Sequence, residues 1–316
     1  MFLNFLIAAV FAGTPLLFGT IGEIISEKAG HLNLGVEGMM AMGACVGFMA
    51  GYYTDSLAVA LVGAFTAGML GALIYSVLTV TFMADQNVTG LTLTIFGTGL
   101  SNFVGEYMIV NSASSSLKLP EGITAQMNNI NIPGLSDIPV AGSILFSYNP
   151  FVYLGVFVAV MCGIYFNHTK IGLNLRAIGE NPAAADAAGI KVTELKYFNV
   201  LLGGGICGIG GAYCSMIICG GVWMSNSVNG LGWIAVALVI FASWSPARAI
   251  LGSFIFGAYN ILKYYFPKTW ITIPNAFYDM LPFIITALVL VVTSIRKSRE
   301  NSQPASCGIN YFREER

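Results

Sequence analysis

Two long stretches of this chain contain no charged residue, and they constrain its fold more than any other feature. Leu57 to Ala84 gives 28 consecutive uncharged residues, and Tyr197 to Ala247 gives 51. A helix needs about 20 apolar residues to cross the hydrocarbon core of a bilayer, so the longer stretch has room for two crossings and a turn. The chain is therefore expected to cross a membrane several times.

The composition agrees with a membrane location. Of the 316 residues, 56% are hydrophobic and 9% are charged, whereas charged residues make up about a quarter of a soluble domain. A transmembrane β-barrel would alternate apolar and polar residues in segments of about 10, and no such alternation is visible. We therefore expect an all-α polytopic membrane protein. The net charge of −1 gives no reason to expect nucleic acid as a partner.

Apolar windows and the residues that interrupt them predict about nine transmembrane helices, within a range of eight to ten. The expected spans lie near residues 5–25, 34–53, 57–83, 88–110, 148–167, 197–219, 226–243, 248–266 and 275–295. Together they form one membrane domain over residues 1–295. Residues 296–316 are expected to form a disordered, charged tail.

Basic residues set the expected orientation, because Lys and Arg accumulate in cytoplasmic loops. Eleven of the fourteen fall on one side of the predicted spans: Lys28, Lys170, Arg176, Lys191, Lys196, Arg248, Arg296, Lys297, Arg299, Arg313 and Arg316. That side is expected to be cytoplasmic and to hold the C-terminus, and nine spans would then place the N-terminus outside. Residues 168–196 become the longest cytoplasmic loop, and residues 111–147 become an external loop.

The sequence GENPAAADAAGI, at residues 179–190, predicts a short capped helix within the cytoplasmic loop. Asn181 can cap it, Pro182 fits the first helical position, Ala183 to Ala188 continue it and Gly189 can end it. About two turns span roughly 10 Å, which is too short to cross a membrane. The segment has few large apolar residues, which disfavours the alternative of an amphipathic helix lying among lipid headgroups.

Small residues recur at every fourth position in two spans and predict close contact between helices. One set lies in the span 57–83: Ala60, Ala64, Gly68, Ala72 and Ser76. Two adjacent sets lie in the span 197–219: Gly203, Cys207 and Gly211, and Gly204, Gly208 and Ala212. The second span also matches the dinucleotide pattern G-x-G-x-x-G, but it follows no strand and opens no βαβ unit, so helix packing is the better interpretation.

Polar side chains inside the predicted spans are candidates for a solute path, because burying them in lipid is costly. Glu37 and Asn33 could order a broken helix beside such a path. Alternatively, Glu37 sits at the cytoplasmic interface, where its charge suits a helix N-terminus. Further candidates lie in the span 88–110: Thr92, Thr94, Phe96 and Asn102. They suit an uncharged, hydroxylated solute, although the hydroxyls could instead bond to the carbonyl four residues earlier and be purely structural.

No combination of residues in the sequence predicts catalysis or metal binding. There is no Walker A pattern, neither histidine has a metal-ligand partner at helical spacing, and no nucleophile lies in a pattern with a base. The six cysteines form no CxxC pair, so neither a disulfide framework nor a zinc site is expected. The chain is thus not expected to be an enzyme.

Three segments resemble one family of transport proteins. They read SEKAGHLNLGVEGMMAMGA at 26–44, LRAIGENPAAADAAGIKV at 175–192 and SPARAILGSFIFGAYNIL at 245–262. In wording and order they resemble the permease subunits of ABC importers in the branched-chain amino acid and simple-sugar permease family. The wording NLGVEGMM is most similar to the nucleoside-type subgroup. The resemblance implies the fold of a type II ABC importer permease that moves nucleosides across the cytoplasmic membrane.

The resemblance also implies a role for the capped helix, which looks like the coupling helix that docks in a cleft of the cytoplasmic ATPase. The implied coupling residues are Gly179, Glu180, Asn181, Pro182, Ala183, Ala184, Ala188, Gly189 and Ile190. The implied partners are a cytoplasmic ATP-binding subunit, a second and related permease chain, an extracytoplasmic solute-binding protein and the lipid bilayer. ATP and Mg²⁺ would be bound by the ATPase, and this chain would carry no cofactor.

Three other functions remain open from the sequence. The same machinery could import simple sugars such as ribose, or small amino acids, because no residue spacing decides the solute. An ion-coupled secondary transporter would need intramembrane acids for its coupling ion, and only Glu37 could serve. A non-transporting membrane scaffold would leave the capped helix without a role.

Overall fold

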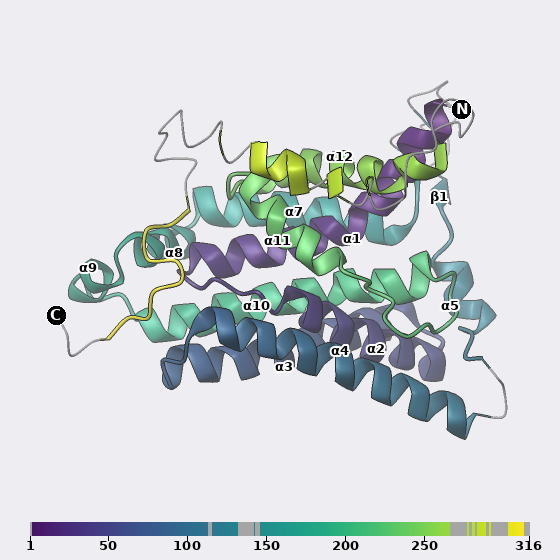
Figure 1. Ribbon diagram of the computed structural model, residues 1–316, viewed down its shortest axis with the longest axis horizontal. Helices are drawn as coiled ribbons and strands as arrows, with labels where there is room; N and C mark the ends of the chain where they lie inside the picture. The colour runs from purple at the N-terminus through teal and green to yellow at the C-terminus, as the bar shows by residue number, and fades with distance from the viewer. Residues whose placement is uncertain are drawn as a thin grey trace.

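The computed structural model describes residues 2–112, 116–131, 142, 146–265, 277, 280–281, 283–288, 291 and 303–312. Within these residues the protein is a bundle of long helices that lie side by side (Figure 1). Strands β1 (Ile130–Asn131) and β2 (Ser147–Tyr148) form one short antiparallel pair. The predicted all-α class is confirmed for this part of the chain.

The long helices form the body of the bundle. They are α1 (Phe2–Lys28), α2 (Val36–Thr54), α3 (Leu57–Ser76), α4 (Gln86–Asn111), α7 (Pro150–His168), α10 (Val192–Tyr213) and α12 (Pro246–Tyr265). Two π-helical turns, η1 (Val77–Thr81) and η2 (Cys214–Ile218), extend α3 and α10. The shorter helices are α5 (Glu121–Gln126), α8 (Lys170–Glu180), α9 (Pro182–Ala187) and α11 (Leu231–Phe241).

Among the described residues, four helices are long and apolar enough to cross a membrane: Phe2–Lys28, Leu57–Thr81, Pro150–His168 and Val192–Ile218. The count of about nine spans therefore stays a prediction, and most of the expected span 275–295 lies outside the described residues. The expected span 226–243 differs from the structure. Helix α11 begins only at Leu231 and has 11 residues, which extend about 16 Å and do not cross a bilayer.

The two ends of the bundle carry different short elements. Helices α8 and α9 lie at one end, whereas α5 and β1 lie at the opposite end (Figure 1). Residues 168–196 and the described part of 111–147 are therefore separated by the length of the long helices.

Helix α10 lies between several neighbours because glycine on its faces lets them approach closely. An added Cβ would meet the backbone of α1 at Gly203, the backbone of α2 at Gly211 and the backbone of α3 at Gly208. The facing stripe on α3 is buried: Ala60, Ala64, Ala72 and Ser76 are each 0% exposed. The predicted close approach of another helix to each stripe is confirmed, and the structure shows that the two stripes pack on each other.

Replacing Gly208 by alanine is expected to destabilise the folded protein by about 1–3 kcal/mol, the usual cost of overpacking a well-packed core. The new methyl group would collide with the carbonyl of Ala64 on α3. Thermal unfolding in detergent measures the effect. Gly163→Ala on α7 is the matched control, since nothing lies within 4 Å of its added Cβ, and alanine favours a helix by up to about 1 kcal/mol. Equal midpoints for Gly208→Ala and the unchanged protein would contradict this packing.

The expectation of a disordered tail does not hold for residues 303–312. Ser306 is 7% exposed, and its backbone N–H donates to the carbonyl of Gly179, at 2.9 Å. The charged residues that suggest disorder flank this segment, whereas the segment itself contains no charged residue. The rest of the expected tail lies outside the described residues.

Candidate functional site: a capped helix and a polar cavity

Residues 179–190 form the capped helix that the sequence predicts. Helix α9 spans Pro182–Ala187, with Pro182 in its first turn. The side-chain oxygen of Asn181 accepts a hydrogen bond from the backbone N–H of Ala184, at 3.0 Å. Gly189 has a φ of 82°, a left-handed conformation that glycine adopts easily just after a helix. The prediction of this local structure is confirmed.

One face of α9 packs on the protein and the other is open. Ala185 is 4% exposed and packs in a small apolar cluster with Ile178 and Val192. Asn181 is exposed at the N-cap of the helix. From the body of the helix to Gly189, the exposed residues are Ala184, Ala187, Ala188 and Gly189. Because none of these side chains is larger than a methyl group, a partner surface can approach the backbone of α9 closely.

The residues that flank α9 differ in their exposure. Gly179 is buried, and a Cβ there would collide with the carbonyl of Lys28 at the end of α1. Glu180 is exposed, and Ile190 is half-buried against the apolar cluster. Just beyond α9, the Glu194 carboxylate lies 2.8 Å from the ammonium group of Lys191 and raises the pKa of that lysine. Gly179 therefore anchors the segment, while Glu180 belongs to its open surface.

Two of the predicted path residues hold the break between α1 and α2. The side-chain oxygen of Asn33 accepts from the backbone N–H of Gly35, and its own backbone N–H donates to Glu23, both at 2.9 Å. The Thr94 hydroxyl donates to the carbonyl of Leu34, also at 2.9 Å. Asn33 and Thr94 satisfy backbone groups that the break leaves without helical partners.

Glu37, in the first turn of α2, also caps α11. Its two carboxylate oxygens accept hydrogen bonds from the backbone N–H groups of Gly230 (2.7 Å) and Gly232 (2.6 Å). A carboxylate at a helix N-terminus satisfies otherwise unpaired donors and interacts favourably with the helix dipole. Glu37 is 6% exposed, so α11 begins inside the protein.

The chain reaches that internal helix start through a non-helical segment. Residues 222–230 contact α2 and α4 in turn: the Trp223 ring lies 5.4 Å from that of Phe48, and Asn226 bonds to Asn102. The segment thus runs along α2 from its C-terminal half towards Glu37. In membrane proteins, irregular backbone within the hydrocarbon region occurs only where it is buried in protein or lines a cavity.

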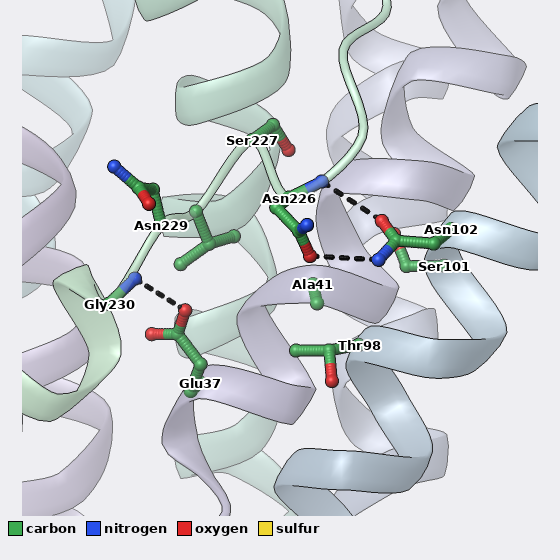
Figure 2. A pocket seen from close by; sticks show the side chains of 10 residues that line it. Glu37, Ala41, Thr98, Ser101, Asn102, Asn226, Ser227, Asn229 and Gly230 are labelled. Atoms are coloured by element: carbon green, nitrogen blue, oxygen red, sulfur yellow. Dashed lines mark hydrogen bonds between the residues drawn. The ribbon is translucent and has the colours of Figure 1, made fainter.

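A cavity of about 350 Å³ lies where this segment meets α2 and α4 (Figure 2). Its lining residues are Glu37, Ala41, Thr98, Ser101, Asn102, Asn226, Ser227, Val228, Asn229 and Gly230. Two hydrogen bonds join the asparagines, from Asn102 Nδ2 to Asn226 Oδ1 (2.8 Å) and from the Asn226 backbone N–H to Asn102 Oδ1 (2.9 Å). Amides, hydroxyls and one carboxylate therefore face a space within the usual size range of small-molecule pockets.

Of the predicted path residues, Glu37 and Asn102 line this cavity, and the other candidates do not. Thr92 is exposed, and its hydroxyl donates to the carbonyl of Val88, at 2.8 Å. Phe96 is 48% exposed and does not line the cavity. For Thr92 the structural alternative therefore applies, in which the hydroxyl bonds to the carbonyl four residues earlier in its own helix.

Several lining residues are not among the path candidates that the sequence predicts. Thr98 lies three positions before Ser101 and four before Asn102, so it is a neighbour of both on the surface of α4. The run SNSVNG at 225–230 is a polar interruption of the longest uncharged stretch. This interruption is a sequence signal for a non-helical segment, although the expected span 226–243 includes most of it as the start of a helix.

Comparison with known proteins identifies the family. The family model described as "Branched-chain amino acid transport system / permease component" matches residues 5–290. The chain is 33% identical to a nucleoside ABC transporter permease protein of Lactococcus lactis, over 95% of this chain and 94% of that protein. It is 31% identical to a guanosine ABC transporter permease protein of Bacillus subtilis, over 90% of this chain and 89% of that protein.

A third relative is similar but has a different assigned solute. The chain is 34% identical to a protein of Haloferax volcanii, named provisionally as a glucose ABC transporter permease protein, over 81% of this chain and 75% of that protein. Such permeases are membrane subunits and not enzymes, since a separate subunit hydrolyses ATP. The matches cover most of this sequence and of its relatives, so the chain belongs to the branched-chain amino acid transport system permease family of ABC transporters.

Proposed function

We propose that this chain is a permease subunit of an ATP-driven importer that moves nucleosides across the cytoplasmic membrane. The observation that carries the proposal is the alignment with the nucleoside permease of Lactococcus lactis, which extends over 95% of this chain and 94% of that protein. The guanosine permease of Bacillus subtilis aligns almost as completely. Membership of an ABC permease family argues against the ion-coupled alternative.

The cavity supports a path for an uncharged polar solute. Asn102, Ser101 and Asn226 present amide and hydroxyl groups that can hydrogen-bond to ring nitrogens and ribose hydroxyls. The single carboxylate, that of Glu37, accepts two backbone hydrogen bonds at the start of α11, and the other polar groups that line the cavity are uncharged. Glu37 and Asn102 are therefore proposed to lie on the translocation path, and Thr92 and Phe96 are not.

Helix α9 is the proposed docking element for the ATP-binding subunit, which would hold ATP and Mg²⁺. Its open face of small side chains suits insertion into a cleft, and it projects from one end of the bundle (Figure 1). The ATPase would drive transport by binding two states of the permease with different affinity. In this arrangement α9 and the C-terminus are cytoplasmic, and the loop 111–147 faces the solute-binding protein. A second, related permease chain would complete the complex, with about nine spans in this one.

Glucose or another simple sugar is the second candidate solute, because the relative from Haloferax volcanii is 34% identical. That alignment covers less of both chains than the alignment with the nucleoside permease. The cavity groups would also bind sugar hydroxyls, so the cavity does not separate the two solutes.

Uptake measurements separate the candidate solutes. Cells that lack this chain should lose uptake of labelled guanosine, and the restored gene should recover it. Unlabelled nucleosides should compete with the label, whereas glucose, ribose and leucine should not. Loss of labelled glucose uptake with normal guanosine uptake would instead make the chain part of a sugar importer.

A further inference from the structure

Residues 303–312 lie against α8 and other elements at the end of the bundle that carries α9 (Figure 1, yellow). We call residues 303–312 the C-terminal strap. It makes hydrogen bonds to three parts of the protein that are far apart in the sequence, and each attachment involves a different side chain.

The first attachment is at the end of α8. The backbone N–H of Ser306 donates to the carbonyl of Gly179 (2.9 Å), and its hydroxyl also reaches that carbonyl (2.6 Å). The last carbonyls of a helix have no partner within the helix, and Ser306 supplies one. The strap is thereby fixed three residues before Pro182, where α9 begins.

The second attachment is at the turn between α3 and α4. The Asn310 side chain donates to the carbonyls of Met83 (2.6 Å) and Ala84 (3.1 Å), and it accepts from Gln86 Nε2 (3.1 Å). The side-chain oxygen of Gln86 in turn accepts from the backbone N–H of Leu32, at 2.9 Å. Asn310 therefore connects the strap to the first residue of α4 and, through Gln86, to the break that precedes α2.

The third attachment is on α9 itself. The Tyr311 hydroxyl donates to a carboxylate oxygen of Asp186, at 2.8 Å. The Tyr311 ring packs on the apolar cluster that includes Ala185. Helix α9 is thus held by the strap as well as by its covalent neighbours α8 and α10.

These attachments connect α9 to α2 and α4, the two helices that contribute residues to the cavity. Helix α4 begins at Gln86 and carries Asn102, whereas α2 follows Leu32 and carries Glu37. We propose that Asn310 and Tyr311 are positioning residues that tie α9 to the starts of α2 and α4, so that displacement of α9 reaches the cavity. This inference rests on the proposed docking of the ATPase at α9.

The test uses the intact transporter, assembled with its ATPase, second permease and solute-binding protein in lipid vesicles. The measured quantities are solute transported per ATP hydrolysed and the amount of ATPase that co-purifies with the permease. For Tyr311→Phe, which removes one oxygen atom, transport per ATP should fall about tenfold, the size expected for one hydrogen bond to a charged group. Co-purification of the ATPase should be unchanged. Tyr53→Phe is the control, because Tyr53 is 71% exposed near the far end of α2.

A double-variant cycle tests whether the tyrosine acts through α9. If it does, Tyr311→Phe combined with Asp186→Ala should lower transport per ATP no further than Asp186→Ala alone. A strap that only stabilises the fold would lower the unfolding temperature and leave transport per ATP unchanged, which would overturn the inference. Asn310→Ala removes the second attachment and should also lower transport per ATP. If that variant fails to insert, the result for Tyr311→Phe decides.

Failure of the strap and failure of the docking proposal give different results. The variant Ala184→Arg places a charge on the open face of α9 and tests the docking proposal. If transport per ATP is normal in Tyr311→Phe but lost in Ala184→Arg, the role of the strap is overturned and the docking proposal stands. If transport per ATP is normal in Ala184→Arg, α9 does not dock the ATPase, and the inference about the strap fails as well.

Discussion

ATP-driven transport is expected to fall at least about thirtyfold in an Ala184→Arg variant that still inserts in the membrane. Ala184 is exposed on the open face of α9, so the substitution disturbs no buried contact of the permease. In the proposed docking cleft, the new side chain adds bulk and an unpaired charge. Uncompensated charges in interfaces cost about 2–5 kcal/mol, and each 1.4 kcal/mol is tenfold in affinity.

Two measurements and one control isolate the docking defect. The amount of ATPase that co-purifies with Ala184→Arg should fall together with uptake, while the amount of permease in the membrane should not. Ala125→Arg on α5 is the matched control, because Ala125 is also exposed on a six-residue helix but lies at the other end of the bundle (Figure 1). The amount of ATPase that co-purifies with Ala125→Arg should equal that of the unchanged protein. Normal uptake and normal ATPase recovery for Ala184→Arg would rule out docking at this face.

Removal of the Glu37 carboxylate should have the largest effect on folding. In Glu37→Leu, the backbone N–H groups of Gly230 and Gly232 lose their acceptors. Each buried donor without a partner costs about 1–3 kcal/mol, so the free energy of unfolding should fall by about 2–6 kcal/mol. Because the same contacts set where α11 begins, transport should be lost as well. The measurements are thermal unfolding in detergent and solute uptake.

A graded pair of variants distinguishes this cap from a general effect of charge removal. Glu37→Gln keeps one acceptor oxygen, so its unfolding temperature should lie between those of Glu37→Leu and the unchanged protein. Glu106→Gln is the matched control, since Glu106 is exposed on α4, and it should unfold within about 0.5 kcal/mol of the unchanged protein. If Glu37→Leu and Glu106→Gln unfold at the same temperature, the two hydrogen bonds contribute nothing to stability.

The features that the sequence predicts well are those encoded within a few residues. Asn181, Pro182 and Gly189 act on the helix they flank, so local rules of capping suffice for α9. The small-residue stripes of α3 and α10 are also regular, because the spacing of four residues places them on one helix face. Neither feature depends on how distant segments are arranged.

The missed features depend on contacts between distant parts of the chain. Glu37 and Gly230 are separated by 193 positions, and the start of α11 inside the protein follows from that contact. The strap likewise depends on Ser306 meeting Gly179, 127 positions away. Thr92 and Thr94 show a third difficulty. Both are threonines in one polar helix, and only the packing decides that Thr94 is buried and Thr92 exposed.

The glycine contacts of α10 have a mechanical consequence. At Gly203, Gly208 and Gly211 the backbone of α10 lies directly against the backbone of α1, α3 and α2, so no rotamer change at these three contacts can absorb a displacement. Close-packed interiors transmit strain instead of yielding to it. A tilt of α10 would therefore move α1, α2 and α3 with it as one block. The motion that gives alternating access is expected at the periphery of this block, where α4 and α11 contact the partly exposed segment 222–230.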